Sequence, residues 1–295
     1  MILSGKELSA RIKEEIKGKC SAFEQKTGRK PGLAVVLVGN NPASVTYVSG
    51  KRKACEEVGI EHFDCFFPDT VKQEELIECV NTLNANCNVD GILVQLPLPS
   101  HIDEATVVNA IKPEKDVDGF TPSNTGKLLL GEKGFVACTP KGITRLLDYY
   151  RISTQGKNVC IVGRSNIVGK PMAAILVQRD RNATVTVCNS FTPDLASYIR
   201  KADIVISAAG RVNLITSDMV KEGAVVIDVG MNRVPDSSKK SGYCLRGDVD
   251  FENVASKAYA ITPVPGGVGP MTITMLMENT LIAACAAVNT EVSSL

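Results

Sequence analysis

The residue types best suited to acid–base chemistry lie in the segment SVTYVSGKRKACEEVGI, residues 44–60. Ser44, Tyr47 and Lys51 follow the spacing i, i+3, i+7, so in a helix their side chains share one face. A lysine can transfer protons near neutral pH when burial or a neighbouring dipole lowers its pKa, and a tyrosine beside it can hydrogen-bond it and stack on a flat substrate. Because most helical lysines point at water, an ordinary solvated helix is the alternative interpretation.

A second candidate site is the segment VCIVGRSNIVGKPMA, whose pattern predicts a strand, a turn and a helix. Gly163 ends the expected strand, while Gly169 and Pro171 open the helix. A glycine turn lets a phosphate approach the backbone, and a helix N-terminus offers free N–H groups and a positive dipole end. The spacing is G-x5-G and departs from the usual dinucleotide fingerprint G-x-G-x-x-G, so a tight packing turn is the alternative.

The end of the next expected strand indicates which dinucleotide would bind. NAD sites often place an acidic residue about 20 residues after the first glycine, where it holds the ribose hydroxyls. Here that strand ends in Asn189 and Ser190, and the first acid is Asp194. Arg164 in the glycine turn and Ser190 suit a 2′-phosphate better than a bare ribose, so the pattern favours NADP.

Alternating strands and helices must position these residues. In the N-terminal half, β-branched runs separated by helical patterns predict strands at 33–39, 62–67 and 90–99 and helices at 44–58, 73–84 and 103–111. A second α/β series predicts strands at 157–163, 183–188, 202–210 and 223–230, with helices from about 169 and near 193–201. A polar surface loop is expected at 236–242 and a buried helix at 271–288.

This order predicts an α/β protein of two domains with a ligand cleft between them. Residues 1–137 together with 271–295 would form an N-terminal α/β domain with a mostly parallel sheet, because the last helix can cross back to pack on it. Residues 138–270 would form a Rossmann-type dinucleotide-binding domain. The length of 295 residues is enough for two cores.

Composition argues against several classes of function. The formal net charge is +1, and the chain has no tryptophan and 5% aromatic residues, so nucleic acid is not an expected partner. Ten cysteines without a C-x-x-C pair and only two histidines argue against a metal site and favour free thiols, so a cytoplasmic protein is expected. Glu278 and Asn279 interrupt the most apolar stretch, and the N-terminus lacks a signal-peptide core, so no membrane partner is expected.

Four motifs, QLPLP, KDVDGF, GRSNIVGKP and PVPGGVGPMT, closely resemble in this order the bifunctional methylenetetrahydrofolate dehydrogenase/methenyltetrahydrofolate cyclohydrolase family. The resemblance extends over essentially the whole chain. It implies an enzyme that oxidises 5,10-methylenetetrahydrofolate to the methenyl cation with NADP and hydrolyses that cation to 10-formyltetrahydrofolate at the same site. It also implies a folate substrate and a homodimer.

The resemblance assigns roles to individual residues, four of them catalytic. Lys51 matches the catalytic lysine, Tyr47 the stacking and orienting tyrosine, and Gln95 the partner that would hydrogen-bond and tune the lysine. Asp118 matches the acid that pairs with the pterin ring, whose N–H edge suits a carboxylate accepting two hydrogen bonds. The implied substrate-binding positions are Ser44, Tyr47, Asp118, Pro263, Gly266 and Gly267. The implied cofactor-binding positions are Gly163, Arg164, Ser165, Ser190 and Met231.

One departure from the family pattern affects the cofactor side. The family often has CHSKT after the second strand of this domain, whereas this chain has CNSFT. Asn189 replaces the histidine and Phe191 replaces the lysine, which removes a positive group near the 2′-phosphate and leaves Arg164 and Ser190 with more of the phosphate binding. The strength of the preference for NADP over NAD therefore does not follow from the sequence.

Three rival functions make different demands on the sequence. A short-chain dehydrogenase also uses Tyr-x-x-x-Lys, but its glycine motif normally comes first, whereas here Tyr47 precedes Gly163. An intact Lys51 argues against a dehydrogenase without cyclohydrolase activity, which stays an alternative. A non-catalytic NADP-binding sensor would keep the glycine turn but would have no reason to combine Lys51, Gln95 and Asp118.

Overall fold

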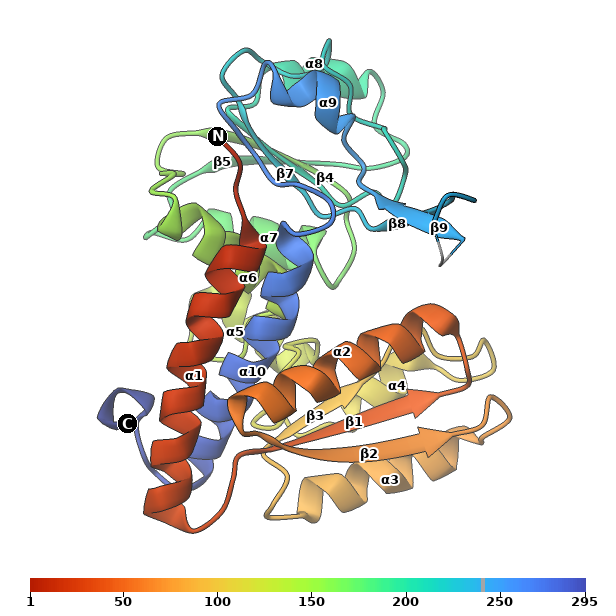
Figure 1. Cartoon of the computed structure of the whole chain (residues 1–295), viewed down its shortest axis with the longest axis vertical. Coiled ribbons are helices and arrows are strands. Elements are labelled where there is room, and N and C mark those ends of the chain that lie inside the picture. Colours follow the sequence, from red (N-terminus) through yellow and green to blue (C-terminus); the bar gives the residue numbers. More distant parts are fainter. Residues whose placement is uncertain (240–241) are drawn as a thin grey trace. The chain divides into compact units, whose positions relative to one another are not determined.

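The computed structural model describes residues 1–239 and 242–295 of the chain. They form two compact units, which we call unit 1 and unit 2 (Figure 1). Unit 1 comprises Met1–Ser9 and Thr139–Thr272, and unit 2 comprises Ala10–Cys138 and Ile273–Leu295. Each unit contains a parallel sheet with helices packed on it, which confirms the predicted α/β fold class.

Unit 2 is built on a three-stranded parallel sheet of order β2-β1-β3, with strands β1 (Gly32–Val38), β2 (Glu61–Phe67) and β3 (Gly91–Val94). Its shorter helices are α2 (Pro42–Val58), α3 (Gln73–Ala85), α4 (Glu104–Asn109) and α5 (Pro122–Leu130). Every residue of β1 is buried, as expected for a central strand covered on both faces. Figure 1 shows α2 on one face of the sheet and α3 on the other.

Helix α2, which carries the first candidate site, has well-formed ends. Asn41 caps its start, since its Oδ1 accepts hydrogen bonds from the backbone N–H groups of Ala43 at 2.9 Å and Ser44 at 3.4 Å. Pro42 occupies the first turn, where its missing N–H has no cost. At the other end Gly59 takes the left-handed conformation, with φ of 82°, and closes the helix. The candidate residues therefore stand on a rigid helix.

Unit 1 contains a five-stranded parallel sheet of order β10-β7-β6-β4-β5. Its strands are β4 (Asn158–Val162), β5 (Thr184–Cys188), β6 (Ile204–Ser207), β7 (Val225–Asp228) and β10 (Ala260–Ile261). Its shorter helices are α6 (Cys138–Tyr149), which begins at the last residue of unit 2, α7 (Gly169–Leu176), α8 (Leu195–Arg200) and α9 (Phe251–Ala255). Strands β5 and β6 lie on opposite sides of β4, so the chain reverses its direction across the sheet there, and such points commonly bind ligands at the carboxyl ends of the strands.

Two long helices, α1 (Gly5–Thr27) and α10 (Val268–Ala287), contribute residues to both units, and a short turn of helix, η1 (Val292–Ser294), ends the chain. Most of α10 is buried, in agreement with the core helix predicted at 271–288. Within the described ranges, no helix is both long and apolar enough to span a bilayer.

Two features of unit 1 differ from the sequence-based expectations. A hairpin of β8 (Asn232–Pro235) and β9 (Tyr243–Arg246) flanks the polar loop expected at 236–242, of which residues 240–241 lie outside the described part of the chain. Residues 1–9 belong to unit 1 rather than to the unit that follows them in sequence. The reason is strand pairing, because Ile2 bridges Ile261 of β10 and the Leu3 N–H donates to the Ile261 carbonyl at 2.8 Å.

Candidate functional site

Lys51 lies on the buried face of α2. The residue is only 7% exposed, and Ser44, Val48 and Cys55 on the same face are also buried. The apolar side chains on this face place a cationic group against the interior of unit 2, where an ammonium loses much of its hydration. The solvated helix considered from the sequence is therefore wrong for Lys51, although Arg52 and Lys53 beside it are exposed.

Gln95 supplies the hydrogen-bond acceptor for the buried amine. Lys51 Nζ donates to Gln95 Oε1 at 2.8 Å. Gln95 follows directly after β3, its backbone N–H donates to the Val36 carbonyl at 2.8 Å, and its Nε2 donates to the Leu96 carbonyl at 2.8 Å. Because the amide nitrogen is already held, the amide oxygen is left to face the lysine. The sequence prediction that Gln95 bonds the lysine agrees with this contact.

Asp118 is electrostatically coupled to Lys51. Burial lowers the pKa of Lys51, and the attraction of the Asp118 carboxylate opposes that change in part. For Asp118, burial raises the pKa, while the nearby Lys51 ammonium lowers it and the neighbouring Asp116 raises it further. The two shifts have the same origin, since each charged form is poorly hydrated. A neutral amine and a neutral carboxyl are thus both easier to form here than at a protein surface.

Two residues that the sequence analysis did not assign to the site hold the loop that carries Asp118. Asp116 is 1% exposed and accepts hydrogen bonds from the backbone N–H groups of Gly119, Phe120 and Thr121 at 2.8–3.1 Å. From α10, Asn279 Nδ2 donates to the Val117 carbonyl at 2.8 Å. The signal for Asp116 was present in the run DVDGFT, because an aspartate shortly before a glycine turn commonly accepts such N–H groups. Asn279 gave no comparable local signal.

Tyr47 and Ser44 lie one and two turns before Lys51 on α2. Tyr47 is 36% exposed, and partial burial raises the pKa of its hydroxyl. Ser44 is buried, and its N–H is engaged by the Asn41 cap. Both side chains therefore belong to the same helix as the lysine, with the tyrosine ring at the boundary between interior and solvent.

The glycine turn of unit 1 is tightly packed. Gly163 follows β4 with φ of 130°, and a Cβ there would collide with the Ala208 carbonyl, which lies after the neighbouring strand β6. A Cβ on Gly169 would likewise collide with the Gly163 carbonyl. Both positions need glycine for steric reasons, because backbone atoms of the protein already occupy the space that a side chain would fill.

Ser165 has a local structural task within this turn. Its Oγ accepts hydrogen bonds from the N–H groups of Val168 at 3.1 Å and Gly169 at 3.4 Å, at the start of α7. A serine hydroxyl that accepts in this way still has a proton to donate. Capping and the predicted contact with a cofactor are therefore compatible.

The other predicted cofactor residues are exposed at the carboxyl ends of the strands. Arg164 follows β4 and Ser190 follows β5, and both are solvent-exposed. Met231 follows β7 and is 39% exposed. These ends of parallel strands lie at one edge of the sheet, the edge at which α/β proteins of this type bind nucleotides.

Pro263, Gly266 and Gly267 lie in unit 1, in the turn between β10 and α10. Gly266 has φ of 103°, and its carbonyl accepts a hydrogen bond from the Lys6 N–H at 2.9 Å. A Cβ on Gly267 would lie 2.5 Å from the Pro263 carbonyl. The turn is thus defined by its backbone, and the predicted contacts of these residues with folate stay a prediction.

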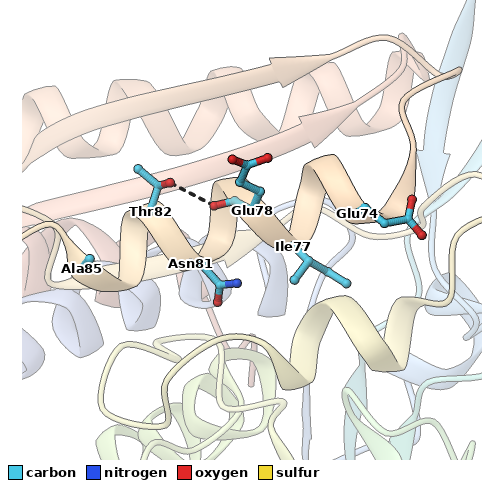
Figure 2. Close-up of a pocket in the computed structure, with 6 residues that line it drawn as sticks. All are labelled: Glu74, Ile77, Glu78, Asn81, Thr82 and Ala85. Atoms are coloured by element: carbon cyan, nitrogen blue, oxygen red, sulfur yellow. Dashed lines mark hydrogen bonds between the residues drawn. The ribbon is translucent and has the colours of Figure 1, made fainter.

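Other parts of the molecule offer less chemistry. A shallow surface hollow of about 530 Å³ lies along α3, lined by Glu74, Ile77, Glu78, Asn81, Thr82 and Ala85 (Figure 2). Its side chains belong to one exposed helix face, and Thr82 Oγ1 is engaged with the Glu78 carbonyl at 3.0 Å. Across residues 1–239 and 242–295, no cluster of three or more histidine, cysteine or acidic side chains is arranged to hold a metal ion.

In class, the chain is a two-unit α/β protein with a nucleotide-binding type of sheet in one unit and a buried lysine site in the other. Residues 3–118 match the family model described as tetrahydrofolate dehydrogenase/cyclohydrolase, catalytic domain. Residues 137–288 match the model for the NAD(P)-binding domain of the same family. The chain therefore belongs to the tetrahydrofolate dehydrogenase/cyclohydrolase family.

Individual relatives agree with this assignment over nearly the whole chain. The bifunctional protein FolD of Chloroherpeton thalassium is 56% identical over 285 residues, which cover 95% of this chain and 97% of the relative. The crystal structure of the bifunctional enzyme FolD from Campylobacter jejuni has 53% identity and a TM-score of 0.92, and covers 97% of this chain and 99% of its own. The Trypanosoma brucei FolD structure, complexed with NADP cofactor and inhibitor, has 41% identity and a TM-score of 0.95, with 98% and 99% coverage.

Proposed function

We propose that the chain oxidises 5,10-methylenetetrahydrofolate to 5,10-methenyltetrahydrofolate with NADP and hydrolyses the product to 10-formyltetrahydrofolate, using Lys51 as the proton carrier. The chain is a bifunctional enzyme of one-carbon metabolism, in keeping with its family. The observation that carries the proposed mechanism is the buried Lys51 amine, hydrogen-bonded to Gln95 at 2.8 Å and coupled to the Asp118 carboxylate.

The residues of unit 1 fit a dinucleotide with a 2′-phosphate. When bound, NADP supplies the hydride acceptor for the first step. The N–H groups at the start of α7, directly after the glycine turn, would hold the pyrophosphate, and Arg164 and Ser190 would hold the 2′-phosphate at the exposed strand ends. Ser165 and Met231 would complete the cofactor contacts. Hydride loss creates a delocalised iminium cation, so this step depends on positioning more than on a strong base.

The second step adds water to the methenyl cation, and Lys51 has the properties of its proton carrier. Because burial lowers the pKa of Lys51, its neutral form is populated more readily than that of an exposed lysine. The neutral amine takes a proton from the attacking water as the C–O bond forms. A proton returned to N5 lets the C–N5 bond break and leaves the formyl group on N10. The overall hydrolysis of the cation releases one proton.

Other residues would hold the folate. The Asp118 carboxylate accepts hydrogen bonds from the N–H edge of the pterin, which favour its ionised form against the effect of burial. The partly exposed Tyr47 ring stacks on the flat pterin, and Ser44 lies one turn away on the same helix. Pro263, Gly266 and Gly267 contribute backbone to folate binding.

The test uses the purified chain with methylenetetrahydrofolate and either NADP or NAD. Reduced-nicotinamide absorbance should rise with NADP and much more slowly with NAD, and methenyltetrahydrofolate supplied alone should lose its absorbance as it is hydrolysed. Equal rates with the two nucleotides would contradict the assignment of the 2′-phosphate contacts. Absence of hydrolysis would contradict the role of the lysine and leave a dehydrogenase only.

We also propose that the protein is a cytoplasmic homodimer. All ten cysteines, which lie in the described ranges, are free, and free thiols persist in a reducing compartment. Strand β2 is an edge strand of the unit 2 sheet, and its Phe66 is 58% exposed, so β2 could pair with a second copy. Sedimentation analysis that finds a monomer at micromolar concentration would contradict the dimer.

A further inference from the structure

An exposed aromatic ring lies beside the arginine of the glycine turn. Phe191 is 82% exposed, which is unusual for a large apolar side chain outside a contact surface. Arg164 Cζ lies 5.8 Å from the centroid of this ring, within the range of a cation–π interaction. Both residues belong to unit 1, so their contact is internal to one compact body.

The fold brings the two residues together through adjacent strands. Strands β4 and β5 pair in parallel with Val162 opposite Cys188, so the residues that follow them emerge side by side at the same sheet edge. Arg164 and Phe191 are two and three residues past these ends. Their proximity is therefore set by strand register.

Asn189 fixes the backbone that presents Phe191. Its Oδ1 accepts a hydrogen bond from the Phe191 N–H at 3.0 Å, and its carbonyl accepts one from the Thr192 N–H at 2.9 Å. The Asn189 N–H in turn donates to Thr192 Oγ1 at 2.9 Å. The two departures from the family pattern at 189 and 191 are thus structurally linked, because the asparagine builds the turn on which the phenylalanine stands.

Arg164 keeps its hydrogen-bonding capacity for a ligand. Among the described residues, it makes no ion pair with a carboxylate, and its interaction partner is the Phe191 ring. A cation–π contact uses none of the N–H donors of the guanidinium as hydrogen bonds, so these donors stay available for the oxygens of a phosphate. An arginine held in this way also loses less side-chain freedom when a phosphate binds.

We infer that Phe191 is a positioning residue that determines nucleotide preference by holding the Arg164 guanidinium for the 2′-phosphate of NADP. This inference rests on the proposed function, because it takes Arg164 as the phosphate ligand. Where the family often has a lysine that carries a positive charge, Phe191 provides an aromatic ring that orients the positive charge of Arg164. Selectivity for NADP then depends on the pair, not on the number of cations at the strand end.

The test compares kcat/KM for NADP and for NAD in four variants. Phe191→Leu removes the π face but keeps apolar bulk, and the NADP/NAD ratio should fall about two- to fivefold, as expected for one exposed cation–π contact. Phe191→Tyr keeps the ring and should keep the ratio. Arg164→Gln should lower the ratio at least tenfold, in line with the loss of a charged hydrogen-bond pair of roughly 1.5–3 kcal/mol. In Arg164→Gln, the further change Phe191→Leu should have no added effect.

Tyr259→Ala is the matched control. Tyr259 is 60% exposed in the same unit but precedes β10, at the amino end of a strand, so its removal should leave the ratio unchanged. Circular dichroism melting of each variant checks that it is folded.

The outcomes distinguish a failure of the inference about Phe191 from a failure of the proposed function. An unchanged ratio in Arg164→Gln would overturn the assignment of Arg164 as the phosphate ligand, and with it the proposed cofactor site. A fall in Arg164→Gln with no change in Phe191→Leu would overturn the inference alone. An equal loss with NADP and NAD in Phe191→Leu would mean that the ring contacts a part shared by both nucleotides, such as adenine, and would also overturn it.

Discussion

The two candidate sites differ in how their charged groups are held. In unit 2 the reactive amine of Lys51 is 7% exposed and already has its protein partner, Gln95. In unit 1 Arg164 and Ser190 are exposed, and the aromatic partner of the arginine is itself 82% exposed. A proton carrier needs burial because desolvation tunes its pKa. A phosphate ligand needs to stay open, since the nucleotide supplies its hydrogen-bonding partner.

The largest test of this contrast is Lys51→Met, which retains the length of the side chain and removes the amine. Hydrolysis of methenyltetrahydrofolate should fall by about 10²- to 10⁴-fold, the usual contribution of a general acid–base group. In the unaltered enzyme the rate should rise with pH as Lys51 loses its proton, and the midpoint should lie below the ordinary lysine pKa because burial lowers it. Loss of methenyl absorbance in a stopped-flow assay measures both.

Lys53→Met is the matched control for this experiment. Lys53 is on the same helix two residues away and is exposed, so its removal should leave the hydrolysis rate close to that of the unaltered chain. Equal losses in the two variants would mean that the effect reflects helix stability or net charge. Such a result would contradict a specific role for the buried lysine.

A smaller effect is expected from Asp118→Asn. The amide keeps the shape but loses the charged acceptor, so folate affinity should fall by about tenfold or more, as for one charged hydrogen-bond pair of roughly 1.5–3 kcal/mol. The change also removes the carboxylate that raises the pKa of Lys51, so the pH midpoint of hydrolysis should move down. Calorimetric titration with a folate and a pH–rate profile measure the two effects. Glu114→Gln, an exposed change in the same loop, should alter neither.

The smallest expected effect concerns the buried carboxylate of Asp228 at the end of β7 in unit 1. Asp228 is 3% exposed, and burial raises its pKa from 3.8 to about 6. Because the folded-state pKa is the higher one, its contribution to stability is fully present below about pH 4 and is lost as the pH rises through 6. Between pH 5 and 7 the free energy of unfolding should therefore fall by about 1 kcal/mol on account of this group.

Urea unfolding of the intact chain and of Asp228→Asn at pH 5 and pH 7 measures the contribution of Asp228 to the pH dependence of the free energy of unfolding. Asp228→Asn should be less stable at both pH values, because its amide NH₂ must face a backbone N–H of Gly230, Asp248 or Val249. Its free energy of unfolding should also lack the fall of about 1 kcal/mol between pH 5 and 7. Asp180→Asn changes an exposed carboxylate of the same unit, and this variant should show the same pH dependence of stability as the intact chain. An identical pH slope in the intact chain and Asp228→Asn would contradict the raised pKa.

Much of the fold could be predicted because it depends on local patterns. Alternation of β-branched runs and helical spacings indicated parallel sheets, and the run at 33–39 proved to be the fully buried central strand β1. The order of strands in the two sheets could not be predicted from alternation, since it depends on pairing between distant segments. The pairing of residues 1–3 with β10 escaped prediction for the same reason.

The sequence indicated candidate residues for the site but not their environment. The spacing of Tyr47 and Lys51 placed both on one helix, yet spacing could not tell a buried lysine from a solvated one. The contact between Phe191 and Arg164 depends on the register of β4 and β5, so the sequence showed only the loss of a positive charge at 191. One of the contacts that hold the loop around Asp118, the hydrogen bond to the Val117 carbonyl, comes from Asn279, more than 150 residues away in the chain.

The orientation of the Gln95 amide has a consequence for turnover. Its nitrogen is tied to the Leu96 carbonyl, so the lysine meets an oxygen whether or not the amine carries its extra proton. An amine in either state has a hydrogen to donate, and this bond can persist through the whole reaction. Charging and discharging Lys51 then requires no rearrangement of its neighbour, and the protein can reset between cycles by the movement of a single hydrogen.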